Sequence, residues 1–237
     1  MKRILILFIA LCLLLSLCSC DPVSPDKNGS SNVDVDYMTS ACSKDSVDEF
    51  MAILGGELQG EGLLSGFTVT KENVYNVTPP QISSQTDYQI FKTSDSCESF
   101  VLIDGEIYYL CTSFGGYGFV NAVPCDFDGD GNTDLLVASS WGSGQHRSEI
   151  SVFNTVTKKS TVLYTSLEDL IVMTSSPSFS SQEDPTALPI YYQVYAVKIT
   201  VNDNNLANLS YVATDVIGSV QSENGTAVFQ PMHSENP

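Results

Sequence analysis

The sequence predicts a mainly β protein, a single domain of antiparallel sheets with one short helix near its N-terminal end. Three observations support this fold class. Short runs rich in Val, Ile, Tyr and Phe recur along most of the chain, as expected of strands. Ser, Thr, Asn and Gly separate these runs, and charged residues make up only 16% of the 237 residues, a composition typical of extracellular β-rich domains. A β-sandwich is the alternative arrangement of the sheets.

The chain divides into three segments. Residues 1–19 have the properties of a leader, as argued below. Residues 20–37 are polar and rich in Pro, Ser and Asn without any periodicity, which predicts a flexible tether. Residues 38–237 are numerous enough to bury one sizeable core. We therefore expect one folded domain after the tether.

The single helix is expected soon after residue 38. Ser46 and Glu49 have the spacing of a capping box, in which the two side chains satisfy free N–H groups of the first turn. Apolar residues follow at helical spacing, and the pair Gly55-Gly56 ends the pattern.

Strands are expected wherever β-branched and aromatic runs lie between turn residues. Asp104-Gly105 has the composition of a tight hairpin turn, and residues 202–205 form a second hairpin turn. Residues 175–189, rich in Pro and Ser, form a surface loop. The expected strands are 67–70, 88–92, 100–103, 107–111, 135–139, 149–153, 160–164, 170–174, 191–201, 208–216 and 227–230.

The stretch CDFDGDGNTDLLV, residues 125–137, predicts a calcium site. Its carboxylates fall at positions 1, 3, 5 and 9 of a loop, and the main-chain carbonyl at position 7 completes the set. Gly131 lies where the loop needs a positive φ. The expected ligands are Asp126, Asp128, Asp130, Asn132 and Asp134. So many carboxylates in one short loop repel one another unless a cation offsets their charge.

The loop does not belong to a helix–loop–helix EF-hand. Position 12 of an EF-hand loop is a bidentate Glu, but Val137 stands there. Residues 135–138 are an apolar run suited to a buried strand. A strand–calcium loop–strand unit therefore fits better.

Residues 114–154 resemble an FG-GAP/VCBS-type repeat. The resemblance rests on the Asp-x-Asp-Gly-Asp-Gly-x-x-Asp-Leu pattern that begins at Asp126, on the Phe114-Gly115 pair upstream and on the strand 150–153 downstream. Such repeats form blades of β-propellers in surface proteins, so the resemblance implies a propeller-blade-like calcium hairpin. The chain has no second Asp-rich loop of this kind.

The first twenty residues predict a lipid anchor. Lys2 and Arg3 precede an apolar run over residues 4–17, and Leu-Cys-Ser-Cys then ends at Cys20, which resembles a bacterial lipobox. Removal of residues 1–19 leaves Cys20 as a diacylated amino terminus, and two acyl chains anchor a protein stably. We therefore expect an extracytoplasmic lipoprotein on the bacterial cell membrane. The alternatives are an ordinary secretory signal or one anchor helix.

Charge excludes one class of partner. The formal net charge is −18, from 10 Lys and Arg against 28 Asp and Glu. A protein this acidic cannot neutralise nucleic-acid phosphates, so nucleic-acid binding is not expected. A peripheral interaction with anionic lipid headgroups is disfavoured for the same reason.

The cysteines of the domain allow two disulfides. Cys97 and Cys111 flank the hairpin at Asp104-Gly105 and are the pair we favour, provided that a bulge or longer turn corrects the register. The alternative is a set of buried free thiols. The four cysteines beyond Cys20 are Cys42, Cys97, Cys111 and Cys125.

Three residues that follow the calcium loop are candidate ligand contacts. Trp141 is the only tryptophan of the chain and offers an aromatic platform, while His146 and Arg147 are polar groups nearby. The alternative interpretation is a structural turn in which Trp141 packs on the sheet and Arg147 pairs with an Asp.

No catalytic residues are expected. The chain lacks a Gly-x-Ser-x-Gly elbow around Ser143, and its many carboxylates identify no particular acid–base pair. We expect a calcium-binding lipoprotein that binds a glycan or a protein partner without catalysis. A secreted hydrolase with a structural calcium ion is the alternative. A transporter's substrate-binding lipoprotein is disfavoured, because strands and helices do not alternate.

Overall fold

The computed structural model describes residues 38–40, 42–55, 69–95, 98–111, 115–175 and 191–232. They all belong to one compact unit, Val35–Pro237. The expected leader, the tether and residues 176–189 of the expected loop lie outside the described residues. Among the described residues, no helix is both long enough and apolar enough to cross a membrane.

The predicted fold class is confirmed, because the described residues form mainly antiparallel strands in three sheets. The first sheet contains β2 (Val74–Asn76), β3 (Gln89–Thr93), β4 (Ser99–Ile103) and β5 (Glu106–Cys111). The second contains β6 (Gly118–Cys125), β7 (Asp134–Trp141), β8 (Arg147–Asn154) and β9 (Lys159–Ser166). The third contains β1 (Met38–Thr39), β10 (Asp169–Ser175), β11 (Tyr191–Val201), β12 (Leu209–Glu223) and β13 (Thr226–Pro231).

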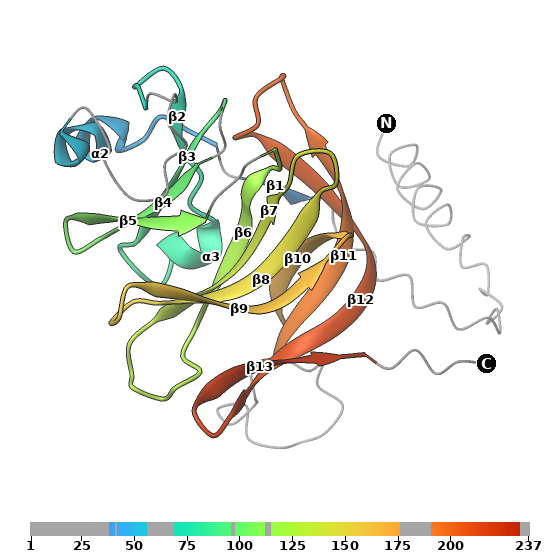
Figure 1. Cartoon of the computed structure of the whole chain (residues 1–237). Coiled ribbons are helices and arrows are strands. Elements are labelled where there is room, and N and C mark those ends of the chain that lie inside the picture. The colour runs from blue at the N-terminus through green and yellow to red at the C-terminus, as the bar shows by residue number, and fades with distance from the viewer. Residues whose placement is uncertain are drawn as a thin grey trace, which may run out of the picture. The chain divides into compact units, whose positions relative to one another are not determined.

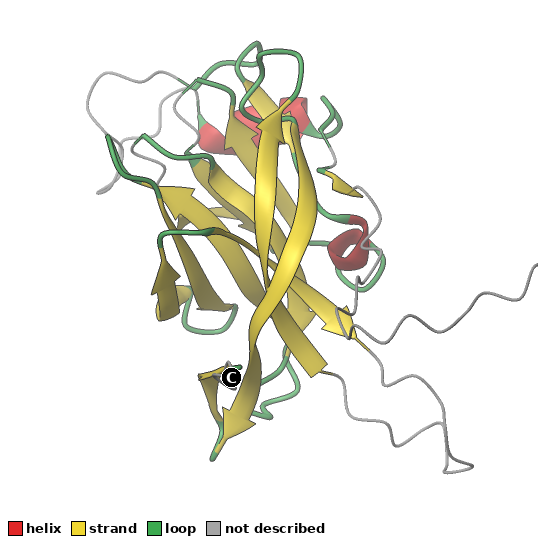
Figure 2. Ribbon diagram, turned by 90° about the vertical axis from the view of Figure 1, so that its right-hand side faces the viewer, coloured by secondary structure: helices red, strands yellow, loops and turns green. Residues whose placement is uncertain are grey.

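The second sheet lies between the first and the third (Figure 1), and strands make up most of the fold in the turned view (Figure 2). Strands β2–β5 and β6–β9 are two meanders in which each strand pairs with the next, and β10–β13 repeat this order with β1 added beside β12. The alternative of a β-sandwich describes only the second and third sheets, because the first sheet packs on the other face of the second.

Both faces of the second sheet are buried. Leu136 and Ala138 belong to the core shared with the third sheet, whereas Leu135 and Val137 belong to the core shared with the first. Successive residues of a strand point to opposite faces. A sheet covered on both faces therefore needs a continuous apolar run, which is the pattern that residues 135–138 present.

A third core lies on the outer face of the first sheet, where helix α2 (Val47–Leu54) packs. Phe50 is fully buried there, and its ring centroid lies 4.3 Å from that of Phe91 in a stacked arrangement. The second helix, α3 (Pro80–Ser83), is one turn between β2 and β3. It was not expected.

Several local predictions are confirmed. Helix α2 ends at Gly55, whose φ of 71° is the left-handed conformation of a helix C-terminus. Asp104-Gly105, with φ values of 54° and 77°, closes the β4–β5 hairpin. Residues 202–208 join β11 to β12, so the expected hairpin is present with a longer turn.

Two local predictions are wrong, and one long strand was missed. Ser46 is left-handed and makes no side-chain cap hydrogen bond, so the capping box does not form. Val69 and Thr70 are not in a strand, because the Thr70 carbonyl accepts turn hydrogen bonds from Asn73 and Val74; residues 67–68 lie outside the described part. Strand β6, whose eight residues are all buried, was not predicted at all.

Candidate metal centre

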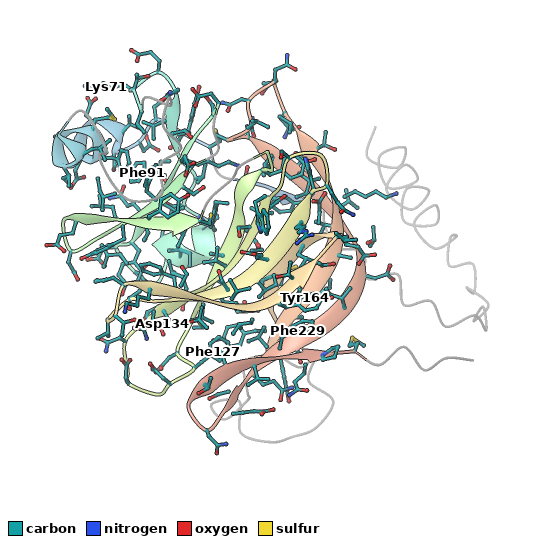
Figure 3. The ribbon with its side chains drawn as sticks, in the orientation of Figure 1. Lys71, Phe91, Phe127, Asp134, Tyr164 and Phe229 are labelled. Carbon is teal, nitrogen blue, oxygen red and sulfur yellow. The ribbon has the colours of Figure 1, made fainter. Side chains whose placement is uncertain are left out.

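The Asp-rich loop connects β6 to β7, the first two strands of the middle sheet. Phe127 fixes its position, because this buried side chain packs in the core between the second and third sheets. Its ring centroid lies 4.9 Å from that of Tyr192 on β11. The loop is thus a surface segment attached to the core by one aromatic residue within the motif itself (Figure 3).

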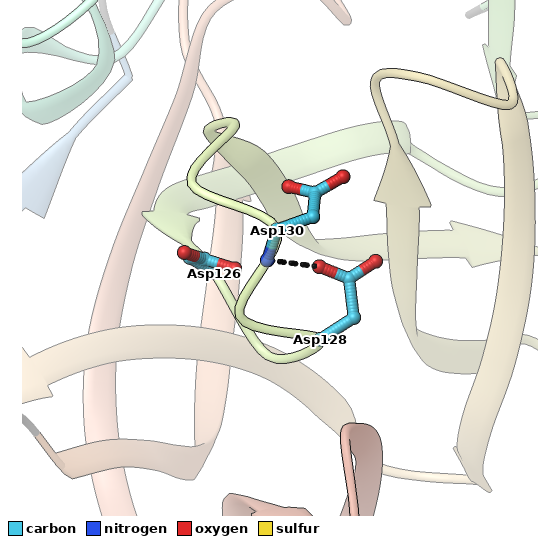
Figure 4. Close-up of side chains that lie close together, drawn as sticks. All are labelled: Asp126, Asp128 and Asp130. Carbon is cyan, nitrogen blue, oxygen red and sulfur yellow. Dashed lines mark hydrogen bonds between the residues drawn. The ribbon is translucent and has the colours of Figure 1, made fainter.

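The structure brings three of the expected ligands together. One carboxylate oxygen each from Asp126, Asp128 and Asp130 lies within 4.8 Å of the others (Figure 4). All three residues are exposed. No Lys or Arg of the described residues forms an ion pair with them, so their mutual repulsion has no side-chain compensation there.

Main-chain N–H groups hold these carboxylates in place. Asp126 accepts hydrogen bonds from Gly129 at 2.8 Å and from Gly131 at 3.2 Å. Asp128 accepts one from the N–H of Asp130, and Asp130 accepts one from the N–H of Asn132 at 2.7 Å. Gly129 and Gly131 have φ values of 74° and 82°, which glycine adopts without strain.

Asp134 plays a different part from the other acidic residues. It is only 2% exposed, and its Oδ1 accepts hydrogen bonds from the Thr155 N–H at 2.8 Å and from the Thr155 hydroxyl at 3.2 Å. Burial raises the pKa of the Asp134 carboxyl, while the hydrogen bonds from Thr155 and Asn154 oppose that shift. Asp134 anchors the end of the loop, and its oxygens do not belong to the group of three.

Asn154 links the two kinds of carboxylate. Its side-chain amide donates to Asp128 Oδ2 at 3.2 Å and to Asp134 Oδ2 at 3.1 Å. Asn154 and Thr155 were not among the expected site residues. They follow Asp134, the last expected ligand, by 20 and 21 positions and come beside it because β8 pairs with β7.

The donor set suits a hard divalent cation. Calcium takes oxygen ligands from carboxylates, main-chain carbonyls and water in flexible geometry. The three clustered carboxylates would supply side-chain ligands, and the Asn132 carbonyl and Asp134 were the further ligands expected from the motif. No Cys or His is in the described cluster, which argues against a zinc site.

The C-terminal hairpin, formed by β12 and β13, contacts the Asp-rich loop. The Ser222 hydroxyl donates to the Phe127 carbonyl at 2.5 Å. Gly225, in the β12–β13 turn, lies against Asp128, since a Cβ added there would be 3.6 Å from the Asp128 carbonyl oxygen. A small hollow of about 150 Å³ remains between the loop, β8, β9 and this turn.

The candidate ligand contacts lie at the β7–β8 hairpin. Trp141 and Arg147 are cross-strand partners, and the guanidinium lies 5.6 Å from the indole ring centroid. The alternative interpretation, a structural turn, expected Arg147 to pair with an Asp. Within the described residues, Arg147 forms no such ion pair. His146 is exposed, and its ring contacts Tyr117 edge-on at 5.5 Å.

The indole of Trp141 is half-buried, and its N–H is enclosed without a hydrogen-bond partner among the residues that the structure describes. Gly116 allows a close approach of two main-chain segments, because a Cβ there would lie 2.4 Å from the Trp141 backbone. A ligand contact by Trp141 stays a prediction. Any part that His146 and Arg147 play in ligand binding stays a prediction.

Only one cysteine of the predicted disulfide, Cys111, is among the described residues, because Cys97 lies outside them. A bulge in the β4–β5 ladder places Cys111 opposite Ser99, which follows Cys97 by two residues in the sequence. The Cys97–Cys111 bond stays a prediction. Within the described residues, Cys42 and Cys125 form no disulfide, and burial raises the pKa of the Cys125 thiol well above its ordinary range.

Comparison of the chain with protein-family profiles, with curated proteins and with solved structures finds no match.

Proposed function

We propose that this chain is a membrane-anchored, extracytoplasmic calcium-binding lipoprotein whose domain acts as a non-catalytic binding module. The observation that carries the proposal is the convergence of Asp126, Asp128 and Asp130 on a glycine-containing loop with no cationic side chain paired to them among the described residues. The resemblance of residues 114–154 to an FG-GAP/VCBS-type repeat supports the same assignment.

The calcium ion would be structural. The loop joins β6 and β7 of the second sheet and is attached to β8 through Asn154 and to the C-terminal hairpin through Ser222. A cation that neutralises the loop would therefore stabilise three segments distant in sequence. Extracellular calcium modules bind with Kd on the order of 0.1–1 mM, which suits an extracytoplasmic location.

The location rests on the Leu17-Cys18-Ser19-Cys20 sequence, which resembles a lipobox. Acylation of Cys20 and the polar segment 21–37 would place the domain at a distance from the bilayer. A domain presented in this way is suited to binding a glycan or a protein of the cell envelope.

Thermal unfolding of the full-length protein, first in EDTA and then in calcium, tests the metal assignment. We expect calcium to raise the melting temperature, because a ligand that binds only the folded state stabilises it. Replacement of Asp128 and Asp130 by Ala should remove the rise. The same rise in that variant would refute the loop assignment.

A further inference from the structure

A pocket of about 520 Å³ lies away from the metal loop, where α3 and the β2–β3 connection meet the segment before α2. We call it the α3 pocket. Its nine lining residues are Ser, Thr, Asp, Asn, Gln and one Tyr, with no aliphatic side chain. None of them belongs to the Asp-rich loop. The volume falls in the range usual for small-ligand sites, but the lining is far more polar than is common.

Internal hydrogen bonds hold the walls of the α3 pocket in place. Asn76 Oδ1 accepts hydrogen bonds from the Thr78 N–H at 3.0 Å and from its hydroxyl at 2.6 Å. Asn76 Nδ2 donates to Gln89 Oε1 and to the Asp45 carbonyl, both at 3.3 Å. The Thr86 hydroxyl donates to the Ile82 carbonyl at 3.0 Å. Such a preorganised site loses little side-chain entropy when a ligand binds.

Other polar groups of the pocket have no partner among the described residues. The carboxylates of Asp45 and Asp87 form no ion pair there, and both residues are exposed. Because Gln89 Oε1 faces Asn76, the Gln89 amide N–H₂ stays available as a donor. Tyr88 is half-buried, with its ring packed on the core between the first and second sheets, and its hydroxyl makes no hydrogen bond with the described residues.

We infer that the α3 pocket binds a neutral carbohydrate. The absence of aliphatic lining disfavours an apolar ligand, and two carboxylates without a cationic partner repel an anionic one. A cation would use the carboxylates but would leave the donors of Gln89 and Tyr88 facing it unpaired. A sugar hydroxyl both donates and accepts, so it matches carboxylate acceptors and amide or phenol donors together.

Tyr88 adds an aromatic ring to this polar lining. Its ring packs on the core, and its hydroxyl, the polar tip of the side chain, can donate to a sugar hydroxyl or accept from one. This inference rests on the proposed binding role of the domain and names its ligand class. It does not require the metal, because the pocket and the Asp-rich loop share no residue.

Titration of the isotope-labelled full-length protein tests the inference. The probes are neutral tetrasaccharides of glucose, N-acetylglucosamine and xylose at millimolar concentration, with spermine as a cationic probe and a tetra-galacturonate as an anionic one. At least one neutral tetrasaccharide should shift the amide resonances of Tyr88 and Gln89. If no neutral probe does so, or if spermine binds there instead, the inference is overturned.

Two double variants make the test specific. Asp45→Ala with Asp87→Ala removes both pocket carboxylates, while Asp215→Ala with Glu168→Ala removes the same charge from exposed positions outside the pocket. The pocket variant should bind the neutral sugar about tenfold more weakly, as expected when charged hydrogen-bond acceptors are lost. The control should stay within about twofold. Equal affinity in both variants would also overturn the inference.

The same samples separate this inference from the proposed calcium site. Melting temperatures measured with EDTA and with calcium report on the Asp-rich loop, and sugar titrations report on the α3 pocket. A calcium-dependent rise without sugar binding refutes only the pocket assignment. Sugar binding without a calcium-dependent rise refutes only the metal assignment.

Discussion

The side-chain nitrogen of Asn154 lies 3.1 Å from Asp134 Oδ2 and donates a hydrogen bond to it. The same amide donates to Asp128, so one side chain at the end of β8 connects the buried anchor of the loop to an exposed carboxylate. An amide nitrogen has two hydrogens and can serve both acceptors. The arrangement of the expected metal ligands therefore depends on a residue outside their motif.

Asn154→Ala should weaken calcium binding by about tenfold or more, the loss expected when a group that positions a metal ligand is removed. Isothermal titration of the full-length protein with calcium measures the change. Asn132→Ala is the matched control, because the ligand expected at that position is the main-chain carbonyl, which the substitution keeps. Unchanged affinity in Asn154→Ala would show that the loop holds its geometry without β8.

Glu98 should make stability depend on pH. It is fully buried, its Oε2 accepts a hydrogen bond from the Tyr109 hydroxyl at 2.6 Å, and its Oε1 has no hydrogen-bond partner in the described part of the chain. Burial raises the pKa of this carboxyl above its ordinary value of 4.5. The folded state therefore favours the protonated form, and the stability that this form contributes is lost as pH rises through the raised pKa.

Glu98→Gln is uncharged at every pH and keeps an acceptor for Tyr109. As pH rises from below 4.5 to neutrality, the native protein should lose free energy of unfolding relative to this variant. Urea unfolding in EDTA at a series of pH values measures the difference. A difference that does not change with pH would contradict the burial of an ionisable carboxyl at this position.

Phe50→Ala should destabilise the domain by about 3–5 kcal/mol, the usual cost of removing a buried aromatic ring. Phe50 is fully buried and stacks on Phe91, so the truncation leaves a cavity between α2 and the first sheet. Phe50→Leu, which fills part of that space, should cost less. Denaturant unfolding measures both, and equal stabilities of the two variants would argue against the packing of α2.

Cys20→Ser should abolish metabolic labelling with a radioactive fatty acid, because the proposed acylation site is lost. Cys18→Ser is the matched control and should keep the label, since Leu17 makes a poor preceding residue for processing at Cys18. Labelling that survives in Cys20→Ser would refute the lipobox assignment.

Local patterns predicted much of the fold. Strand β11 has the predicted bounds, Tyr191–Val201, because β-branched and aromatic residues make up most of it. The Asn224-Gly225 turn between β12 and β13 also carries a recognisable signal, since this residue pair is typical of tight hairpins. Its φ values of 52° and 75° match that signal, although the turn was not among those expected.

Strand β6 shows why local patterns fail elsewhere. It contains Asn121 and Pro124, which are both rare in strands. Pro124 is tolerated because β6 is an edge strand of the second sheet. The side chain of Asn121 accepts from the Val172 N–H at 3.0 Å and donates to the Val172 carbonyl at 2.7 Å. Both compensations depend on tertiary structure, so the sequence of β6 alone does not reveal them.

In the candidate metal centre, too, some features could be predicted from the sequence and others depend on tertiary structure. The spacing of Asp126, Asp128 and Asp130 predicted that their side chains meet, because the ligands are close in sequence and two glycines bend the loop between them. Asp134 shares the motif, but its surroundings come from β8, and burial together with Thr155 makes it an anchor. Contacts between segments twenty residues apart leave no periodic signal in the sequence.

The most direct test of the account is the melting temperature of the full-length protein in EDTA and in calcium at about 100 times Kd, where binding adds about 2.7 kcal/mol. The native chain and the Asp215→Ala/Glu168→Ala control should both show this stabilisation, and Asp128→Ala/Asp130→Ala should show none. No rise in the native chain, or the same rise in the Asp128→Ala/Asp130→Ala variant, would contradict the calcium site.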